Sequence, residues 1–159
     1  MIPRIGFGYD VHQLAEGETF ILGGIKIEHY NGTIAHSDGD VLVHAMCDAI
    51  LGAAALGDIG KHYPDNDPTF KNIDSCILLG KCCQLIREQG YEIGNIDSTI
   101  ALQKPKIGSY LPSMIAKLSE IMSVEIGNIS IKATTTEKLG FVGKQEGVEA
   151  YSSVLIYKK

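Results

Sequence analysis

Two hydrophobic periods alternate along the 159-residue chain and predict a succession of strands and helices. A period of two, or a short apolar run between turn residues, predicts strands over about residues 4–12, 19–22, 25–27, 91–102, 128–136 and 147–157. Apolar positions at helical spacing predict helices over about residues 38–56, 75–89 and 109–122. The longer elements read strand, helix, helix, strand, helix, strand, strand, which predicts an α+β sandwich with helices on one face of a mixed sheet.

Cap and turn residues refine these elements. Ser37 or Asp38 is expected to cap the first helix, which places His44 about two turns inside it. Between the first two helices, residues 58–68 are dense in Gly, Pro and Asp and predict a loop. The last two strands are expected to pair with each other as a hairpin.

Asp10, His12 and His44 are candidate metal ligands. The alternation of the first strand points Asp10 and His12 to one face. His44 shares a polar stripe of the first helix with Asp40 and Asp48, whose carboxylates could orient its imidazole. Three Asp and His ligands without a fourth are typical of a catalytic zinc site with an open position. The alternative is that both histidines are ordinary polar residues, at a strand end and on a helix face.

Two further segments carry groups that suit a phosphate. Because the first helix is expected to begin at His36-Ser37, its free N–H groups would offer an anion site near His44. Residues 134–136 are three consecutive threonines, and the carboxylate of Glu137 after them is a natural Mg²⁺ ligand. Threonines are also good strand formers, and the basic run 103–106 is either a binding loop or a solvated turn.

Composition argues against several classes of function. The formal charge of −5 and the absence of a Lys/Arg cluster argue against nucleic acid as a partner. No apolar run approaches the roughly 20 residues that cross a bilayer, and residues 1–6 lack the apolar block of a signal peptide. We therefore expect a cytoplasmic protein that forms one catalytic domain over residues 1–159. Its cysteines are expected to be buried, reduced and without a chemical role: Cys47, Cys76, Cys82 and Cys83.

Five motifs, in order and over essentially the whole chain, resemble those of the 2-C-methyl-D-erythritol 2,4-cyclodiphosphate synthase family. They are residues 10–12 (DVH), 35–40 (AHSDGD), 52–60 (GAAALGDIG), 63–65 (YPD) and 132–141 (KATTTEKLGF). The resemblance implies a homotrimer of ferredoxin-like subunits in the non-mevalonate isoprenoid pathway. Such an enzyme is a phosphorus–oxygen lyase. The 2-phosphate of 4-diphosphocytidyl-2-C-methyl-D-erythritol 2-phosphate attacks the β-phosphorus, which gives the 2,4-cyclodiphosphate and CMP.

The same resemblance implies roles for individual residues. Zn²⁺, or another divalent transition metal, would be held by Asp10, His12 and His44. Glu137 would hold Mg²⁺ or Mn²⁺ between the α and β phosphates, while His36 and Thr135 would stabilise the transition state. Contacts with the cytidine diphosphate substrate are implied at Asp10, His12, Ser37, Asp58, Ile59, Gly60, Tyr63, Pro64, Asp65, Asn66, Asp67, Leu102, Gln103, Lys104, Pro105, Lys106, Ile107, Gly108, Thr134, Thr136, Glu137, Phe141 and Lys144. In the family, cytidine and its diphosphate lie across a subunit boundary, against residues 102–108 and 134–136.

Two positions depart from the family pattern. Tyr63 stands where the family often has Phe. Lys144 stands where many members have Arg, beside a three-fold axis at which some bind an isoprenoid diphosphate, and Lys lacks the bidentate fork.

Two other functional classes share the metal pattern. A zinc phosphohydrolase would use the open position to activate water, and a third class is a non-catalytic metal- or nucleotide-binding module. The whole-chain resemblance ranks the cyclase above both.

Overall fold

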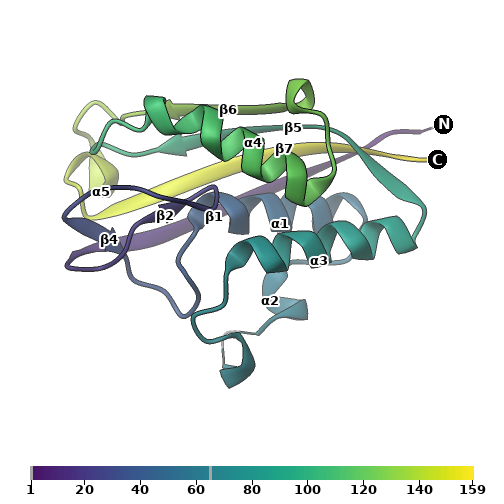
Figure 1. Cartoon of the computed structure of the whole chain (residues 1–159), viewed down its shortest axis with the longest axis horizontal. Helices are drawn as coiled ribbons and strands as arrows, with labels where there is room; N and C mark the ends of the chain where they lie inside the picture. The colour runs from purple at the N-terminus through teal and green to yellow at the C-terminus, as the bar shows by residue number, and fades with distance from the viewer. Residues whose placement is uncertain (1, 65) are drawn as a thin grey trace.

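Residues 2–64 and 66–159 are described by a computed structural model, in which the long helices cover one face of a five-stranded sheet (Figure 1). The strands are β1 (Arg4–Glu16), β2 (Ile21–Leu22), β3 (Ile25–Lys26), β4 (Asn31–Thr33), β5 (Tyr91–Ala101), β6 (Ile129–Thr134) and β7 (Gly147–Lys158). The helices are α1 (Val41–Ala53), α2 (Ile59–His62), α3 (Ser75–Glu88), α4 (Leu111–Met122) and α5 (Gly140–Gly143). Single 3-10 turns lie at Pro68–Phe70, Gly108–Tyr110 and Ile126–Asn128.

The sheet is mixed, with the strand order β4-β1-β7-β5-β6. Its neighbours are antiparallel except for β5 and β6, which run parallel and are joined by the crossover helix α4. Helix α1 packs against β1 and β7, while α3 contacts α1, α4 and β5. This arrangement confirms the prediction of an α+β fold with a mixed sheet and helices on one face.

Helix α1 lies unusually close to β1. A Cβ atom added at Gly6 would come within 1.8 Å of the carbonyl oxygen of Ala49, and one at Gly8 within 1.9 Å of that of Ala45. The two glycines therefore let the helix backbone approach the strand directly. Because alternate residues of a strand share a face, the next positions on that face point toward the start of the same helix.

The first helix begins later than the sequence pattern predicts. Its N-cap is Asp40, whose Oδ1 accepts a hydrogen bond from Val43 N (3.1 Å), so neither Ser37 nor Asp38 is the cap. The Asp40 carboxylate also accepts from two N–H groups in the turn between β2 and β3. Burial raises the pKa of this carboxyl to about 6, although the N–H donors lower it. His44 consequently lies in the first turn of α1 and not two turns inside.

The predicted hairpin between the last two strands is wrong. β6 lies at the sheet edge beside β5, whereas β7 runs between β1 and β5 at the centre. Val148, Val154 and Ile156 on β7 are buried there, which an edge position would not achieve as fully. Residues 135–146 between the two strands are long enough to carry the chain past β5.

Other sequence predictions agree more closely with the structure. α3 is capped by Asp74 and ends before Gly90, and α4 holds Pro112 in its first turn. The segment 58–68, expected to be a loop, contains the short helix α2. All four cysteines are buried and free, as expected. Among the described residues, no helix combines the length and apolar character needed to cross a membrane.

Candidate active site

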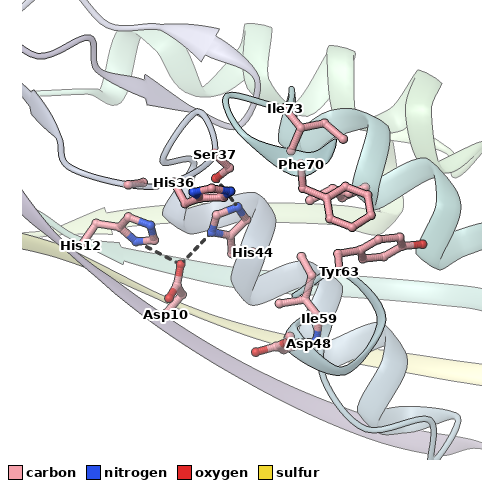
Figure 2. A pocket seen from close by; sticks show the side chains of 13 residues that line it. Asp10, His12, His36, Ser37, His44, Asp48, Ile59, Tyr63, Phe70 and Ile73 are labelled. Atoms are coloured by element: carbon pink, nitrogen blue, oxygen red, sulfur yellow. Dashed lines mark hydrogen bonds and ion pairs between the residues drawn. The ribbon is translucent and has the colours of Figure 1, made fainter. Parts of the chain in front are cut away.

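Three candidate metal ligands come together where β1 passes the start of α1. Asp10 and His12 lie on the face of β1 that turns toward the helices, and His44 faces them from α1 (Figure 2). Asp10 Oδ2 lies 3.1 Å from His12 Nδ1 and 3.0 Å from His44 Nδ1. One ligand atom of each residue lies within 4.8 Å of the others. The three side chains therefore form a possible metal-binding triad.

The chemistry of the triad fits a transition metal such as zinc. His12 Nδ1 is buried, meets no hydrogen-bond geometry among the described residues and lies 3.1 Å from the Asp10 carboxylate, a position that suits a metal ligand. Burial raises the pKa of Asp10, but the imidazoles of His12 and His44 outweigh it and lower the pKa to about 2. Burial lowers the pKa of His44, but the hydrogen bond to Asp10 together with the nearby charges of Asp10, Asp40 and Asp38 more than offsets this and raises it. An ionised carboxylate with two imidazoles is a donor set that Zn²⁺ prefers.

Two serines contact the nitrogen of His44 that points away from Asp10. His44 Nε2 lies 2.8 Å from Ser75 Oγ and 3.2 Å from Ser37 Oγ. The orienting partners expected from helical spacing do not take this position. Asp40 caps α1, and Asp48 accepts from a backbone N–H of α2 at 2.7 Å. That prediction is wrong because the Asp40 carboxylate is buried among backbone N–H donors and the Asp48 carboxylate bonds to Ile59 N.

The start of α1 is also closed to an anion, contrary to the sequence prediction. Asp40 fills that position with its own carboxylate and is fully buried. His36 and Ser37 lie before the helix in turns and line the cavity beside the triad (Figure 2). A phosphate bound here would therefore meet side chains and loop N–H groups and not the free end of a helix.

A cavity of about 180 Å³ opens beside the triad. Several residues predicted to bind metal or substrate line it: Asp10, His12, His36, Ser37, His44, Ile59, Gly60 and Tyr63. Other lining residues were not predicted: Ala35, Asp48, Phe70, Ile73 and Leu78. The helical pattern marks Leu78 as an inward position of α3, but no signal in the sequence shows that this position meets a cavity.

The loop between α1 and α3 forms the wall of this cavity opposite the triad (Figure 2). Tyr63 and Phe70 pack edge to face with ring centroids 5.5 Å apart. Asp58 caps α2 through Lys61 N, while Asp67 Oδ1 accepts from Thr69 N and its carbonyl lies 3.5 Å from His36 Nε2. Two of the predicted contacts, Pro64 and Asn66, are exposed, and Asp65 lies outside the described residues.

A second cavity, of about 520 Å³, lies at the edge of the sheet formed by β5 and β6. It gathers most of the residues predicted to contact cytidine: Leu102, Gln103, Pro105, Lys106, Ile107, Gly108, Thr134 and Thr135. Ser109, Leu111 and Ala133 complete its lining, whereas Lys104 and Thr136 are not part of it. The run 103–106 thus borders a cavity, which the reading as a solvated turn did not predict.

The remaining predicted residues lie on the surface after β6. Glu137 is exposed, with a positive φ of 54°, and its Oε1 accepts from Thr135 Oγ1 at 3.2 Å. Phe141 and Lys144 are exposed on and just after α5, and neither lines the two cavities. The side chain of Glu137 is therefore open to a cation, while Phe141 and Lys144 stand apart from the triad.

The two cavities lie at the same end of the sheet but on different strands. Val11, Glu149, Ala101 and Thr134 form one row across β1, β7, β5 and β6. Three strand spacings, or about 14 Å, separate β1 from β6 along this row. Within one chain, the triad and the second cavity are thus held apart by the width of the sheet.

A family model described as the YgbB family matches residues 3–157. Relatives from Bacteroides fragilis and Porphyromonas gingivalis, both named 2-C-methyl-D-erythritol 2,4-cyclodiphosphate synthase, are 58% and 56% identical over 153 residues. These matches cover 96% of this chain and 96% and 94% of the relatives.

Solved structures give a similar result. The bifunctional IspDF from Campylobacter jejuni matches 99% of this chain with a TM-score of 0.96 and 44% identity, and this chain spans 43% of that longer protein. IspF from Plasmodium falciparum in a CDP complex matches with a TM-score of 0.87 and 36% identity, over 99% of this chain and 97% of its own length.

Proposed function

This chain belongs to the YgbB family of 2-C-methyl-D-erythritol 2,4-cyclodiphosphate synthases, and from this premise we propose how its residues bind and cyclise the substrate. The enzyme is a lyase of the non-mevalonate isoprenoid pathway. It converts 4-diphosphocytidyl-2-C-methyl-D-erythritol 2-phosphate into 2-C-methyl-D-erythritol 2,4-cyclodiphosphate and CMP.

Asp10, His12 and His44 hold zinc, or another divalent transition metal, in this proposal, and Glu137 holds Mg²⁺ or Mn²⁺ with the substrate diphosphate. The observation that carries it is the convergence of the buried His12 Nδ1 and of His44 Nδ1 on Oδ2 of the ionised Asp10 carboxylate. When bound, these dications would supply Lewis acids that polarise phosphate oxygens and spread the negative charge of the diphosphate.

The cavity beside the triad receives the methylerythritol part and its 2-phosphate. His36 and Ser37 are placed to donate hydrogen bonds to phosphate oxygens, and His36 also stabilises the charge of the transition state. Tyr63 and Phe70 exclude water from the opposite wall, and Asp58, Gly60 and the loop from Tyr63 to Asp67 bind the carbon skeleton. Because the substrate phosphate is itself the nucleophile, the protein contributes positioning and needs no strong base.

The second cavity receives cytidine and its diphosphate. Residues 102–108 and 134–136 bind this part, and the Thr135 hydroxyl stabilises the transition state beside Glu137. The related IspF in its CDP complex supports a cytidine diphosphate as the ligand class. Phe141 is proposed as a further substrate contact and Lys144 as a contact at the axis of an oligomer, where it offers a point charge without the fork of Arg.

We also propose a cytoplasmic homotrimer of ferredoxin-like subunits, each with one catalytic domain. The face of the sheet away from the helices supports an assembly, because large hydrophobic side chains are exposed on it: Ile5 (77%), Phe7 (62%), Val11 (43%), Tyr9 (42%) and Tyr151 (36%). The separation of about 14 Å between β1, beside the triad, and β6, beside the second cavity, supports a site that a neighbouring subunit completes.

Release of CMP from the diphosphocytidyl substrate tests this function. Purified protein with Zn²⁺ and Mg²⁺ should release CMP, and Thr135→Ala should slow the release about 100-fold, because a donor to the transition state is lost. The matched variant Ser130→Ala removes an exposed hydroxyl from β6, the strand that Thr135 directly follows, and should keep the wild-type rate. No CMP from the wild type with both metals would contradict the function, and full activity of Thr135→Ala would contradict the role of Thr135.

A further inference from the structure

The two ring nitrogens of His44 face different partners. Its Nδ1 faces Asp10 Oδ2 at 3.0 Å, on the side of the proposed metal. Its Nε2 lies 2.8 Å from the Oγ of Ser75, the first residue of α3. Ser75 is fully buried, so bulk water does not compete for this contact. Whether Nδ1 of His44 is free to bind a metal therefore depends on whether Ser75 accepts a proton from Nε2 or donates one to it.

The hydroxyl proton of Ser75 is used in a hydrogen bond to Asp38. Ser75 Oγ makes a short hydrogen bond to Asp38 Oδ1, and Asp38 Oδ2 accepts from Ser75 N at 3.0 Å. Asp40 N also donates to Asp38 Oδ1, at 3.1 Å, which fixes the carboxylate from a second element. Both oxygens of Asp38 already accept from backbone N–H groups, so Ser75 Oγ is the donor in its hydrogen bond to Asp38. The Oγ lone pair that remains can only accept a proton from His44 Nε2.

We propose that Ser75 and Asp38 are positioning residues that hold a proton on His44 Nε2 and thereby make Nδ1 the metal-binding atom. The inference rests on the proposed metal site, and it assigns a second layer of partners to that site. Hydrogen bonds of this kind orient the ligating imidazole and raise its basicity. They also make α3 part of the metal centre, since Ser75 is the residue through which that helix reaches it.

Ser37 is the competing partner of the same nitrogen. Its Oγ lies farther from His44 Nε2, at 3.2 Å, and accepts from Gly39 N at 3.3 Å. No carboxylate holds the Ser37 proton among the described contacts, so this hydroxyl can rotate and either donate or accept. Ser37 therefore does not impose a tautomer, whereas Ser75 does.

Nitrogen-15 spectra of histidine side chains test the assignment in the zinc-loaded wild type. The signals of His44, identified by their loss in His44→Gln, should show a proton on Nε2 that exchanges slowly, with Nδ1 bound to metal. This measurement needs no serine variant, so it decides the question even if such a variant does not fold. A metal-bound Nε2, or a proton on Nδ1, would overturn the proposal.

Zinc affinity gives a second test with matched variants. Ser75→Ala should weaken zinc binding about 10- to 100-fold in competition with a chelator, as loss of such partners does. Ser98→Ala removes another buried serine, whose Oγ bonds to Ser152 Oγ at 3.0 Å between β5 and β7, and should leave zinc affinity unchanged. Ser37→Ala should weaken it much less than Ser75→Ala.

Unchanged zinc affinity in a folded Ser75→Ala would overturn the proposal while leaving the metal site in place. Equal losses in Ser75→Ala and Ser98→Ala would also overturn it, because they would show a general effect of removing buried hydroxyls. Neither readout uses turnover. Failure of the proposed reaction would appear separately, as absence of CMP release from a zinc-loaded wild type.

Discussion

At the scale of single residues, two acidic side chains near the start of α1 have opposite surroundings. Asp40 is fully buried among three backbone N–H donors, so its carboxylate is a structural group. Asp10 lies beside two imidazoles at the wall of a cavity, so its carboxylate can bind a metal ion. The surroundings of the two carboxylates, and not their residue type, separate the two roles.

Replacing His44 with Ala should remove most of the bound zinc, because the site keeps only one imidazole and one carboxylate. Elemental analysis after dialysis measures this directly. His29→Ala changes an imidazole outside the triad and should keep its zinc. Full zinc content in His44→Ala would remove His44 from the metal site.

Asp40→Asn should lower the free energy of unfolding by about 1–3 kcal/mol. The amide keeps one oxygen for Gly23 N and Val43 N, but its NH₂ group then faces the N–H of Gly24, which is left without an acceptor. Chemical denaturation at one protein concentration measures the loss. Glu125→Gln, at an exposed carboxylate without a side-chain cap bond, should change stability by less than about 0.5 kcal/mol. Equal stabilities would contradict a structural role for Asp40.

Residue type and spacing predicted the triad but not its partners. Asp10 and His12 are two residues apart on a strand, so their shared face follows from the period of the strand. Ser75 is 31 residues from His44 and serves as the first residue of a capped helix, so the sequence marks it only as a helix start. Its contact with His44 depends on how α3 packs on α1, which no local pattern encodes.

At the scale of elements, the close approach of α1 to β1 places the triad. Gly6 and Gly8 remove the side chains that would keep the helix away, and the same face of β1 then carries Asp10 and His12 to the first turn of α1. Any side chain at these two positions would push α1, and His44 with it, away from Asp10 and His12. Strand and helix thus act as one unit in forming the site.

Gly8→Ala should destabilise the protein by about 3 kcal/mol or more, because the added Cβ would meet backbone atoms that cannot rotate aside. The nearest is the carbonyl oxygen of Ala45, at 1.9 Å. Thermal unfolding is a suitable measurement, and Gly127→Ala is a suitable control because open space surrounds that position. If Gly8→Ala and Gly127→Ala unfolded at the same temperature, the helix would not lie this close to the strand.

Element types were predictable from the sequence, but strand neighbours were not. The period of two correctly predicted strands near residues 128–136 and 147–157, and these are β6 and β7. Their pairing depends on long-range competition, in which β7 buries more apolar surface between β1 and β5 than it would beside β6. The start of α1 was missed for a similar reason, since the bonds of Asp40 to the β2–β3 turn are not local.

At the scale of the whole molecule, the sheet has one covered face and one open face. The helices cover the first, and the second exposes an apolar stripe on β1 and β7. On β1 this stripe consists of the odd-numbered residues. A strand pattern alone predicts that these residues face solvent. Only the resemblance to a trimeric family predicted that this stripe contacts another subunit.

Phe7→Glu should convert the proposed trimer into monomers and slow CMP release, because it places a charge in the middle of the open face. Light scattering gives the mass of each species. Ile126→Glu changes a side chain of similar exposure, 59% against 62%, on the turn before β6, and should remain a trimer. A trimeric Phe7→Glu, or a monomeric wild type with full activity, would contradict the proposed assembly.

In the proposed reaction the 2-phosphate of the substrate, and not water, attacks the β-phosphorus. The reaction run in ¹⁸O-labelled water with Zn²⁺ and Mg²⁺, followed by mass spectrometry of the products, distinguishes the two nucleophiles. Because every oxygen around the reacting phosphorus comes from the substrate, both CMP and the cyclic diphosphate should be unlabelled. Label in a linear phosphorylated product, with CMP released at the same rate, would show that water attacks and that the metal site serves a phosphohydrolase.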